Sequence, residues 1–333
     1  MVTTIKDVGE IELLNRLKKF MRSGQIDDDI AEITSYKKQL LINTDLLVED
    51  IHFSDKISNA KDIGWKCITT NVSDLICSGS DNIVSFTVGI VLPSSTNLTW
   101  VENLYEGMCE AIEIFGGEII GGDCSSGAIK IISISAIGEK NEPRLHRGNA
   151  LPGDYLVSTG HHGLSKLGLA LLTSEDLPSE VQLSSELVQR AIQAHKRPYP
   201  AINALRALRA TKPESLSWRA AGTDSSYGLL ESVRGICKSS GCQAVLSKTS
   251  LPKHPDWPEH SNWNEWCLNG GEDYELVLSL PKKWARPRRK SRSTSRGSCR
   301  RRGGPGGRRR EAMMTRPGRS GRPRRPKRVL PSY

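Results

Sequence analysis

Short apolar runs alternate along the first 285 residues with longer stretches in which apolar residues recur every three or four positions. The short runs are rich in β-branched residues and end at turn formers, which is typical of buried strands, whereas the longer periodic stretches indicate amphipathic helices. We therefore expect strands at 39–45, 83–93, 118–123, 128–138, 154–160, 243–248 and 274–281, and helices at 60–78, 98–115, 163–173, 185–195 and 227–239.

The alternation of strands and helices predicts an α/β or α+β fold. Asn97 and Ser184 lie just ahead of two predicted helices and suit N-caps. The turn sequence Pro-Gly-Asp in "NALPGD" (149–154) leads into a new strand. We therefore expect two domains, 1–150 and 151–285, which agrees with the usual domain size of about 100–200 residues.

The overall composition favours a cytoplasmic protein. The N-terminus carries acids and an amphipathic helix pattern (Ile11, Leu14, Leu17) in place of the apolar block of a signal peptide. No run approaches the roughly 18–20 apolar residues that a membrane helix needs. Seven of the eight cysteines lie in 1–285 without C-x-x-C spacing, so we expect reduced thiols in preference to a zinc site or a disulfide framework.

The last 48 residues, 286–333, differ from the rest in charge. They hold 19 of the 47 Lys and Arg residues and a single acid, Glu311, which gives +18, whereas 28 basic and 36 acidic residues give 1–285 a charge of −8. This Arg/Gly/Pro/Ser-rich tail has little to bury, and we expect it to be disordered on its own. A basic run is a weak signal for nucleic-acid binding, and the acidic body does not share it.

Aspartates recur beside the predicted strands and helices. Asp45 and Asp123 end strands, Asp74 lies in a helix, Asp224 opens "GTDSSYGLL", and "IDDD" (26–29) precedes the first strand. Any one of them could be an ordinary turn or cap residue. Together they would repel one another unless cations neutralised them, and Mg²⁺ prefers such oxygen ligands and bridges them to phosphates. The sequence contains neither a P-loop nor the protein-kinase motifs, so nucleotide chemistry here needs another scaffold.

Five segments carry a family resemblance: "INTDLLVEDIHF" (42–53), "TTNVSDLICSGSD" (69–81), "IIGGDCSSG" (119–127), "RGNALPGDYLVSTG" (147–160) and "NGGEDYELVLSLP" (269–281). In this order they resemble bacterial thiamine-monophosphate kinase, of the aminoimidazole-ribotide synthase-like superfamily, from about Gly9 to Pro281. The resemblance implies a two-domain fold and a homodimer formed through the N-terminal domains. It also implies phosphorylation of thiamine phosphate to thiamine diphosphate with ATP and several Mg²⁺ ions.

The resemblance also implies site residues, with Asn43 standing where the family usually has Ser. The metal ligands would be Asp29, Asn43, Thr44, Asp45, Asp74, Asp123 and Asp224. ATP would contact Tyr105, Gly122, Asp123, Arg147 and Ser226, and thiamine phosphate would face His52 and Glu272. No further catalytic residue is expected, because phosphoryl transfer depends mainly on positioning and charge neutralisation.

Four of these residues have ordinary structural interpretations when the resemblance is set aside. Arg147 also suits a surface arginine before a turn, and His52 a hydrogen-bonded histidine at a strand edge. Glu272 also suits a cap or turn residue, and Tyr105 a core aromatic on an amphipathic helix.

The chain departs from the family pattern at two places. The usual Ser-Asp-Gly reads Ser226-Tyr227-Gly228, and a neutral phenol is a poor Mg²⁺ ligand, so we expect weaker binding of one metal and slower turnover. The family continues past "YELVLSLP" with further secondary structure, and here the basic tail stands instead. We interpret the tail as the product of a shifted reading frame, which would leave the C-terminal domain incomplete.

Two other functions remain open on the sequence. One is another ATP-using enzyme of the same superfamily, which the histidine of "IHF" and the segment "GGEDYEL" disfavour. The other is an inactive remnant whose tail binds nucleic acid; removal of the tail would abolish that binding, whereas kinase activity would depend on Asp45 and Asp74.

Overall fold

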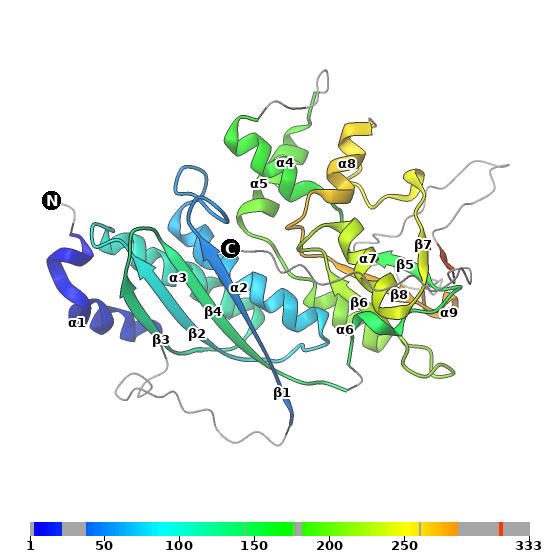
Figure 1. Ribbon diagram of the computed structural model, residues 1–333, viewed down its shortest axis with the longest axis horizontal. Helices are drawn as coiled ribbons and strands as arrows, with labels where there is room; N and C mark the ends of the chain where they lie inside the picture. Colours follow the sequence, from blue (N-terminus) through cyan, green and yellow to red (C-terminus); the bar gives the residue numbers. More distant parts are fainter. Residues whose placement is uncertain are drawn as a thin grey trace, which may run out of the picture.

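The structure is a computed structural model that describes residues 3–21, 38–142, 144–175, 177, 182–259, 261–285 and 313–315. Within the described residues, each half of the chain contains one β-sheet (Figure 1). The predicted ligand Asp29, with the rest of "IDDD", and nearly all of the basic tail lie outside the described residues.

The N-terminal half contains a four-stranded sheet in the order β1-β4-β2-β3. Strand β4 runs antiparallel to β1 and β2, whereas β2 and β3 are parallel. A parallel pair needs a crossover connection, and the helix α3 supplies it. The strands are β1 (Leu40–Val48), β2 (Ile83–Leu92), β3 (Ile119–Ser126) and β4 (Ile131–Glu139).

Two long helices, α2 (Ala60–Cys77) and α3 (Leu98–Phe115), pack together on one face of this sheet (Figure 1). Two glycines allow the helices to approach closely. A Cβ atom at Gly64 would lie 1.9 Å from the backbone oxygen of Leu104, and one at Gly107 would lie 2.0 Å from that of Lys61. Helix α2 also contacts β6, α5 and α6 of the second half, which explains why nearly every position along it is buried.

The second half contains an antiparallel sheet in the order β6-β8-β5-β9-β7. Its strands are β5 (Tyr155–Ser158), β6 (Ala221–Asp224), β7 (Gln243–Val245), β8 (Leu276–Leu280) and β9 (Met313–Thr315). Its helices are α4 (Leu164–Thr173), α5 (Ser185–Lys196), α6 (Ile202–Ala210), α7 (Leu229–Ser240), α8 (Ser261–Asn269) and α9 (Lys282–Ala285). The remaining elements are α1 (Ile5–Leu17) and three short 3₁₀ turns, η1 (Lys18–Phe20), η2 (Arg147–Asn149) and η3 (Lys248–Ser250).

The largest apolar cluster continues from one half of the chain into the other. Val88 and Ile132 of the first sheet belong to it, and so do Leu205 of α6 and Leu278 of β8. The division at residue 150 therefore stays a prediction, because each sheet belongs to one half while this core is shared.

Every predicted strand and helix corresponds to an observed element, and both predicted N-caps are confirmed. The side chain of Asn97 accepts the N–H of Thr99 at 2.9 Å, and that of Ser184 accepts the N–H of Leu187 at 3.2 Å. The periodicity did not reveal α6, β6, α8 or the short helix α9. Within the tail, Met313–Thr315 pair between β5 and β7 as β9.

The predicted positions of two aspartates were wrong in detail. Asp45 and Asp123 lie inside β1 and β3, because both strands continue for three further residues. Asp224, for which no strand was predicted, is the last residue of β6.

None of the helices in the described part of the chain combines the length and the apolarity that a bilayer-spanning helix requires. The seven described cysteines form no disulfide.

Candidate functional site

Three carboxylates converge where the first sheet, α2 and the second sheet meet. Asp45 projects from the middle of β1, Asp74 lies near the end of α2, and Asp224 ends β6. All three line one cavity of about 370 Å³, together with His52, Glu272 and other side chains. The structure thus brings together three of the predicted metal ligands from elements far apart in the sequence.

The proximity of these carboxylates changes their acidity. Burial, followed by the charges of Asp224 and Asp45, raises the pKa of Asp74 to about 7. Burial and the charge of Asp224 also raise the pKa of Asp45, and burial raises that of Asp224. Ionising all three is unfavourable without a neutralising cation nearby.

Hydroxyl groups hold the buried Asp224 in place. Ser73 of α2 donates to Asp224 Oδ2 at 2.8 Å, and Ser226 donates to Asp224 Oδ1 at 3.1 Å. The first hydrogen bond joins the two halves of the chain at the site. It follows that α2 fixes the second-half carboxylate as well as its own Asp74.

Asn43 completes the group on the β1 side. Its amide nitrogen donates to Asp74 Oδ2 and to Asn71 Oδ1, both at 3.1 Å. Its carbonyl oxygen Oδ1 is buried without a hydrogen-bond partner among the described residues. The thiol of Cys77, which the sequence analysis did not include, lies with the carboxylates of Asp74 and Asp224, all within 4.8 Å of one another.

Two further cavities share walls with the first. One of about 510 Å³ is lined by Asn43, Asp74 and Arg147, and one of about 840 Å³ is lined by Arg147, Asp224, Ser226 and Tyr227. Arg147 lies in η2, and its Nε donates to Thr223 Oγ1 at 3.0 Å. This arginine therefore lines two cavities that each share one aspartate, Asp74 or Asp224, with the cavity of His52 and Glu272.

The predicted substrate residues lie in the 370 Å³ cavity. His52 accepts the backbone N–H of Val48 at its Nδ1, 3.1 Å away. Glu272 adopts a left-handed backbone conformation (φ 54°), and its N–H donates to the backbone oxygen of Ser226 at 2.8 Å. An unfavourable conformation of this kind at a non-glycine residue is held by its surroundings and is common at functional sites.

Sequence reasoning missed a cation in the same cavity. Lys66 of α2 is only 5% exposed, and its ammonium lies 2.8 Å from Glu272 Oε1. The available signal was a lysine within the otherwise apolar run "IGWKCIT", eight residues before Asp74. Charged residues are seldom buried unless they are paired.

Two predicted ligands are not brought to this cluster. Thr44 and Asp123 project from the sheet face opposite α2, because side chains alternate between the two faces along a strand. The strand register aligns Thr44 with Ser135, and Asp123 with Gly89. Thr44 Oγ1 lies 2.7 Å from Ser135 Oγ on that open face. Their roles as metal ligands stay predictions.

Tyr105 and Gly122 have evident structural roles. Tyr105 is 1% exposed in the core, with its ring centroid 5.5 Å from that of Phe20. The structure thus matches the core-aromatic interpretation of Tyr105 and does not bring it to the cavities. A Cβ atom at Gly122 would lie 1.9 Å from the backbone oxygen of Val88, so the strand pair requires glycine there.

Comparisons with known proteins show which family the chain resembles. Residues 27–139 match the family model "AIR synthase related protein, N-terminal domain". The chain is 52% identical over 282 residues, 85% of each protein, to a thiamine-monophosphate kinase of Prochlorococcus marinus. Among solved structures, AaThiL complexed with AMPPCP and TMP matches with a TM-score of 0.66 and 30% identity over 86% of this chain and 90% of that one. The structure of thiamine-monophosphate kinase from Stenotrophomonas maltophilia matches with a TM-score of 0.69 and 26% identity, over 84% of this chain and 88% of that one.

Proposed function

This chain belongs to the thiamine-monophosphate kinase family, and we propose that it performs the reaction of that family, the ATP-dependent phosphorylation of thiamine monophosphate to thiamine diphosphate. The observation that carries the proposal is the sharing of Asp74 and Asp224 between cavities. Both line the cavity of His52 and Glu272, and each also lines one of the cavities of Arg147.

This arrangement suits the transfer of a phosphoryl group from one bound anion to another. We assign ATP to the side of Arg147 and Ser226, where a guanidinium can contact phosphate oxygens through two hydrogen bonds. We assign thiamine monophosphate to the side of His52 and Glu272. The shared aspartates then lie between donor and acceptor, where charge neutralisation matters most.

We infer that Mg²⁺ is held by the oxygens of Asp45, Asp74 and Asp224. The residues present fit this ion, because carboxylates dominate the cluster and Asn43 Oδ1 is a buried oxygen without a described partner. Burial raises the pKa of all three carboxyls, and neighbouring carboxylates raise those of Asp45 and Asp74 further. When bound, Mg²⁺ would neutralise phosphate charge and let the two anions approach. The Ser73 and Ser226 hydroxyls meanwhile keep Asp224 oriented.

We also propose that the protein is a homodimer joined through the open face of the first sheet. Side chains alternate along β1, and those of Ile42 and Leu46 point outward on that face. Both are apolar, yet they are 70% and 56% exposed. Large apolar side chains exposed on a sheet face favour association with a partner. The absence of disulfides among the described cysteines is compatible with the cytoplasmic location that we propose.

The proposed function is tested by incubating the purified protein with thiamine monophosphate, ATP and Mg²⁺ and measuring thiamine diphosphate. We expect Asp45→Asn and Asp74→Asn to lower turnover by at least about 100-fold, because each removes a charge that holds the cation between donor and acceptor. Asp50→Asn is the matched control, since Asp50 lies on the exposed turn after β1, lines none of the three cavities and has a φ of 61°, which asparagine tolerates. Product formation that survives loss of both site aspartates would contradict the assignment.

A further inference from the structure

Lys66 is the one lysine or arginine among the described residues that line the 370 Å³ cavity. Asp45, Asp74, Asp224 and Glu272 line the same cavity, so its wall carries four carboxylates and one ammonium group. These groups give the cavity wall an excess of negative charge, which opposes the binding of an acceptor that is itself an anion. The position of the single cation therefore bears directly on how a phosphate is accepted.

The geometry of α2 aims Lys66 at the site. Lys66, Thr70 and Asp74 are spaced four residues apart, which places them on one face of the helix, and all three line the cavity. The helix thus presents an ammonium, a hydroxyl and a carboxylate in sequence along the cavity wall. The ammonium lies on the side away from Asp74, toward Glu272.

The ammonium of Lys66 has hydrogen-bonding capacity left for a ligand. Lysine has three N–H donors. Among the described residues, the ammonium of Lys66 pairs with Glu272 Oε1 alone, at 2.8 Å. The other neighbour of Glu272 is His195 of α5, whose Nδ1 lies 3.5 Å from Glu272 Oε2 and 3.1 Å from Ser165 Oγ. Burial, followed by the charge of Lys66, lowers the pKa of His195 to about 4, so Lys66 supplies the positive charge beside Glu272.

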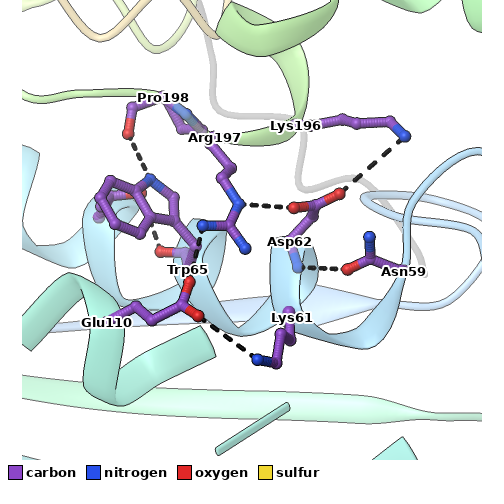
Figure 2. Close-up of polar contacts among 9 residues, drawn as sticks. Asn59, Lys61, Asp62, Trp65, Glu110, Lys196, Arg197 and Pro198 are labelled. Carbon is purple, nitrogen blue, oxygen red and sulfur yellow. Dashed lines mark hydrogen bonds and ion pairs between the residues drawn. The ribbon is translucent and has the colours of Figure 1, made fainter. Parts of the chain in front are cut away.

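A network of ion pairs fixes the elements that carry Lys66 and His195 (Figure 2). Arg197, which follows α5, binds Asp62 of α2 at 2.6 Å and Glu110 of α3 at 2.7 Å. The indole N–H of Trp65, the residue before Lys66, donates to the backbone oxygen of Pro198 at 2.8 Å. Lys66 therefore follows the anchored Trp65 directly, and His195 lies two residues before the anchored Arg197. Glu272 contacts both Lys66 and His195.

We propose that Lys66 binds the phosphate of the acceptor and is the residue by which the site prefers thiamine monophosphate over unphosphorylated thiamine. In the empty site Glu272 balances the ammonium, and in the complex the unused donors of Lys66 contact phosphate oxygens. The burial of Lys66 strengthens these contacts, because a charged hydrogen bond shielded from water is stronger than one at the surface. This inference rests on the proposed function, which places the acceptor in this cavity.

The test measures binding of thiamine monophosphate and of thiamine by titration calorimetry, in the presence of Mg²⁺ and the non-hydrolysable nucleotide AMPPCP. The quantity of interest is the phosphate preference, the ratio of the two dissociation constants. Lys66→Met should lower this preference by about 10- to 100-fold, the usual effect of losing a hydrogen bond to a charged group, while the affinity for thiamine is kept. Lys66→Arg should retain much of the preference, because it retains the charge.

Two further variants separate phosphate binding from a purely structural role. Lys61→Met removes a lysine from the same helix that pairs with Glu106 at 2.9 Å and Glu110 at 3.5 Å and lines none of the three cavities, and it should leave the preference unchanged. In Lys66→Met/Glu272→Gln the unpaired buried carboxylate is removed as well, so the protein should fold, and the preference should stay low. If the double variant regains the preference of the unmodified protein, Lys66 merely neutralises Glu272 and the inference is overturned.

The unmodified protein distinguishes this inference from the proposed function. If it makes no thiamine diphosphate, the proposed function fails. If it is active and Lys66→Met keeps the full phosphate preference, the function stands and only the role of Lys66 is rejected.

Discussion

Tyr227 is the residue at which the site departs most clearly from the family pattern. Its side chain is 82% exposed and lines both the cavity of Glu272 and the 840 Å³ cavity of Arg147. It follows Ser226, which is hydrogen-bonded to Asp224. A carboxylate at this position would face the region where donor and acceptor meet, whereas the phenol offers only a weak ligand to a hard cation.

Tyr227→Asp should therefore lower the Mg²⁺ concentration needed for half-maximal activity and raise turnover. The gain should be about tenfold or less, since one carboxylate is added to at least three. Steady-state rates across a Mg²⁺ titration measure it. Tyr227→Phe is the control, which keeps the ring, adds no ligand and should leave the Mg²⁺ dependence unchanged. An unaltered titration for Tyr227→Asp would show that position 227 holds no metal.

At the scale of elements, the ion-pair network of Arg197 fastens the segment after α5 to α2 and α3. Its guanidinium also lies over the ring of Trp65, 5.4 Å from the ring centroid. Asp62 is 8% exposed, and its other cationic neighbour, Lys196, is 4.0 Å away. Loss of Arg197 would leave Asp62 largely buried with one distant partner.

Arg197→Met should lower the free energy of unfolding by about 1–3 kcal/mol, less than for a fully buried pair because the arginine side chain is 23% exposed. Urea denaturation followed by fluorescence measures the change. Arg206→Met, which removes an arginine 55% exposed and 3.9 Å from Asp81, should have almost no effect. Equal midpoints for the two variants would mean that the network does not stabilise the fold.

At the scale of the whole molecule, the open face of the first sheet carries the proposed dimer. Leu46→Lys should shift the protein toward monomer, because it places a charge beside the exposed apolar side chain of Ile42 in the proposed contact. Sedimentation velocity measures the shift. Ile114→Lys is the control, since Ile114 is 50% exposed but lies on α3, on the other side of the sheet. A monomeric unmodified protein, or a dimer that tolerates Leu46→Lys, would exclude this interface.

The sequence by itself determined the local features. The apolar periodicity located every predicted strand and helix. Asn97 and Ser184 are the N-caps of α3 and α5, as their positions in the sequence predicted. These features depend on neighbours within a few residues, which a single sequence displays. The aspartates Asp45, Asp74 and Asp224 were likewise recognisable, because their surrounding segments resemble one family.

The tertiary structure alone decided which of these residues meet. Strand parity separated Asp123 from Asp45, since a shift of one residue moves a side chain to the other face of a sheet. Packing placed Tyr105 in the core and brought Lys66, His195 and Glu272 together from three distant segments. Such contacts depend on register and on the approach of elements far apart in the chain, and no local pattern in the sequence records them.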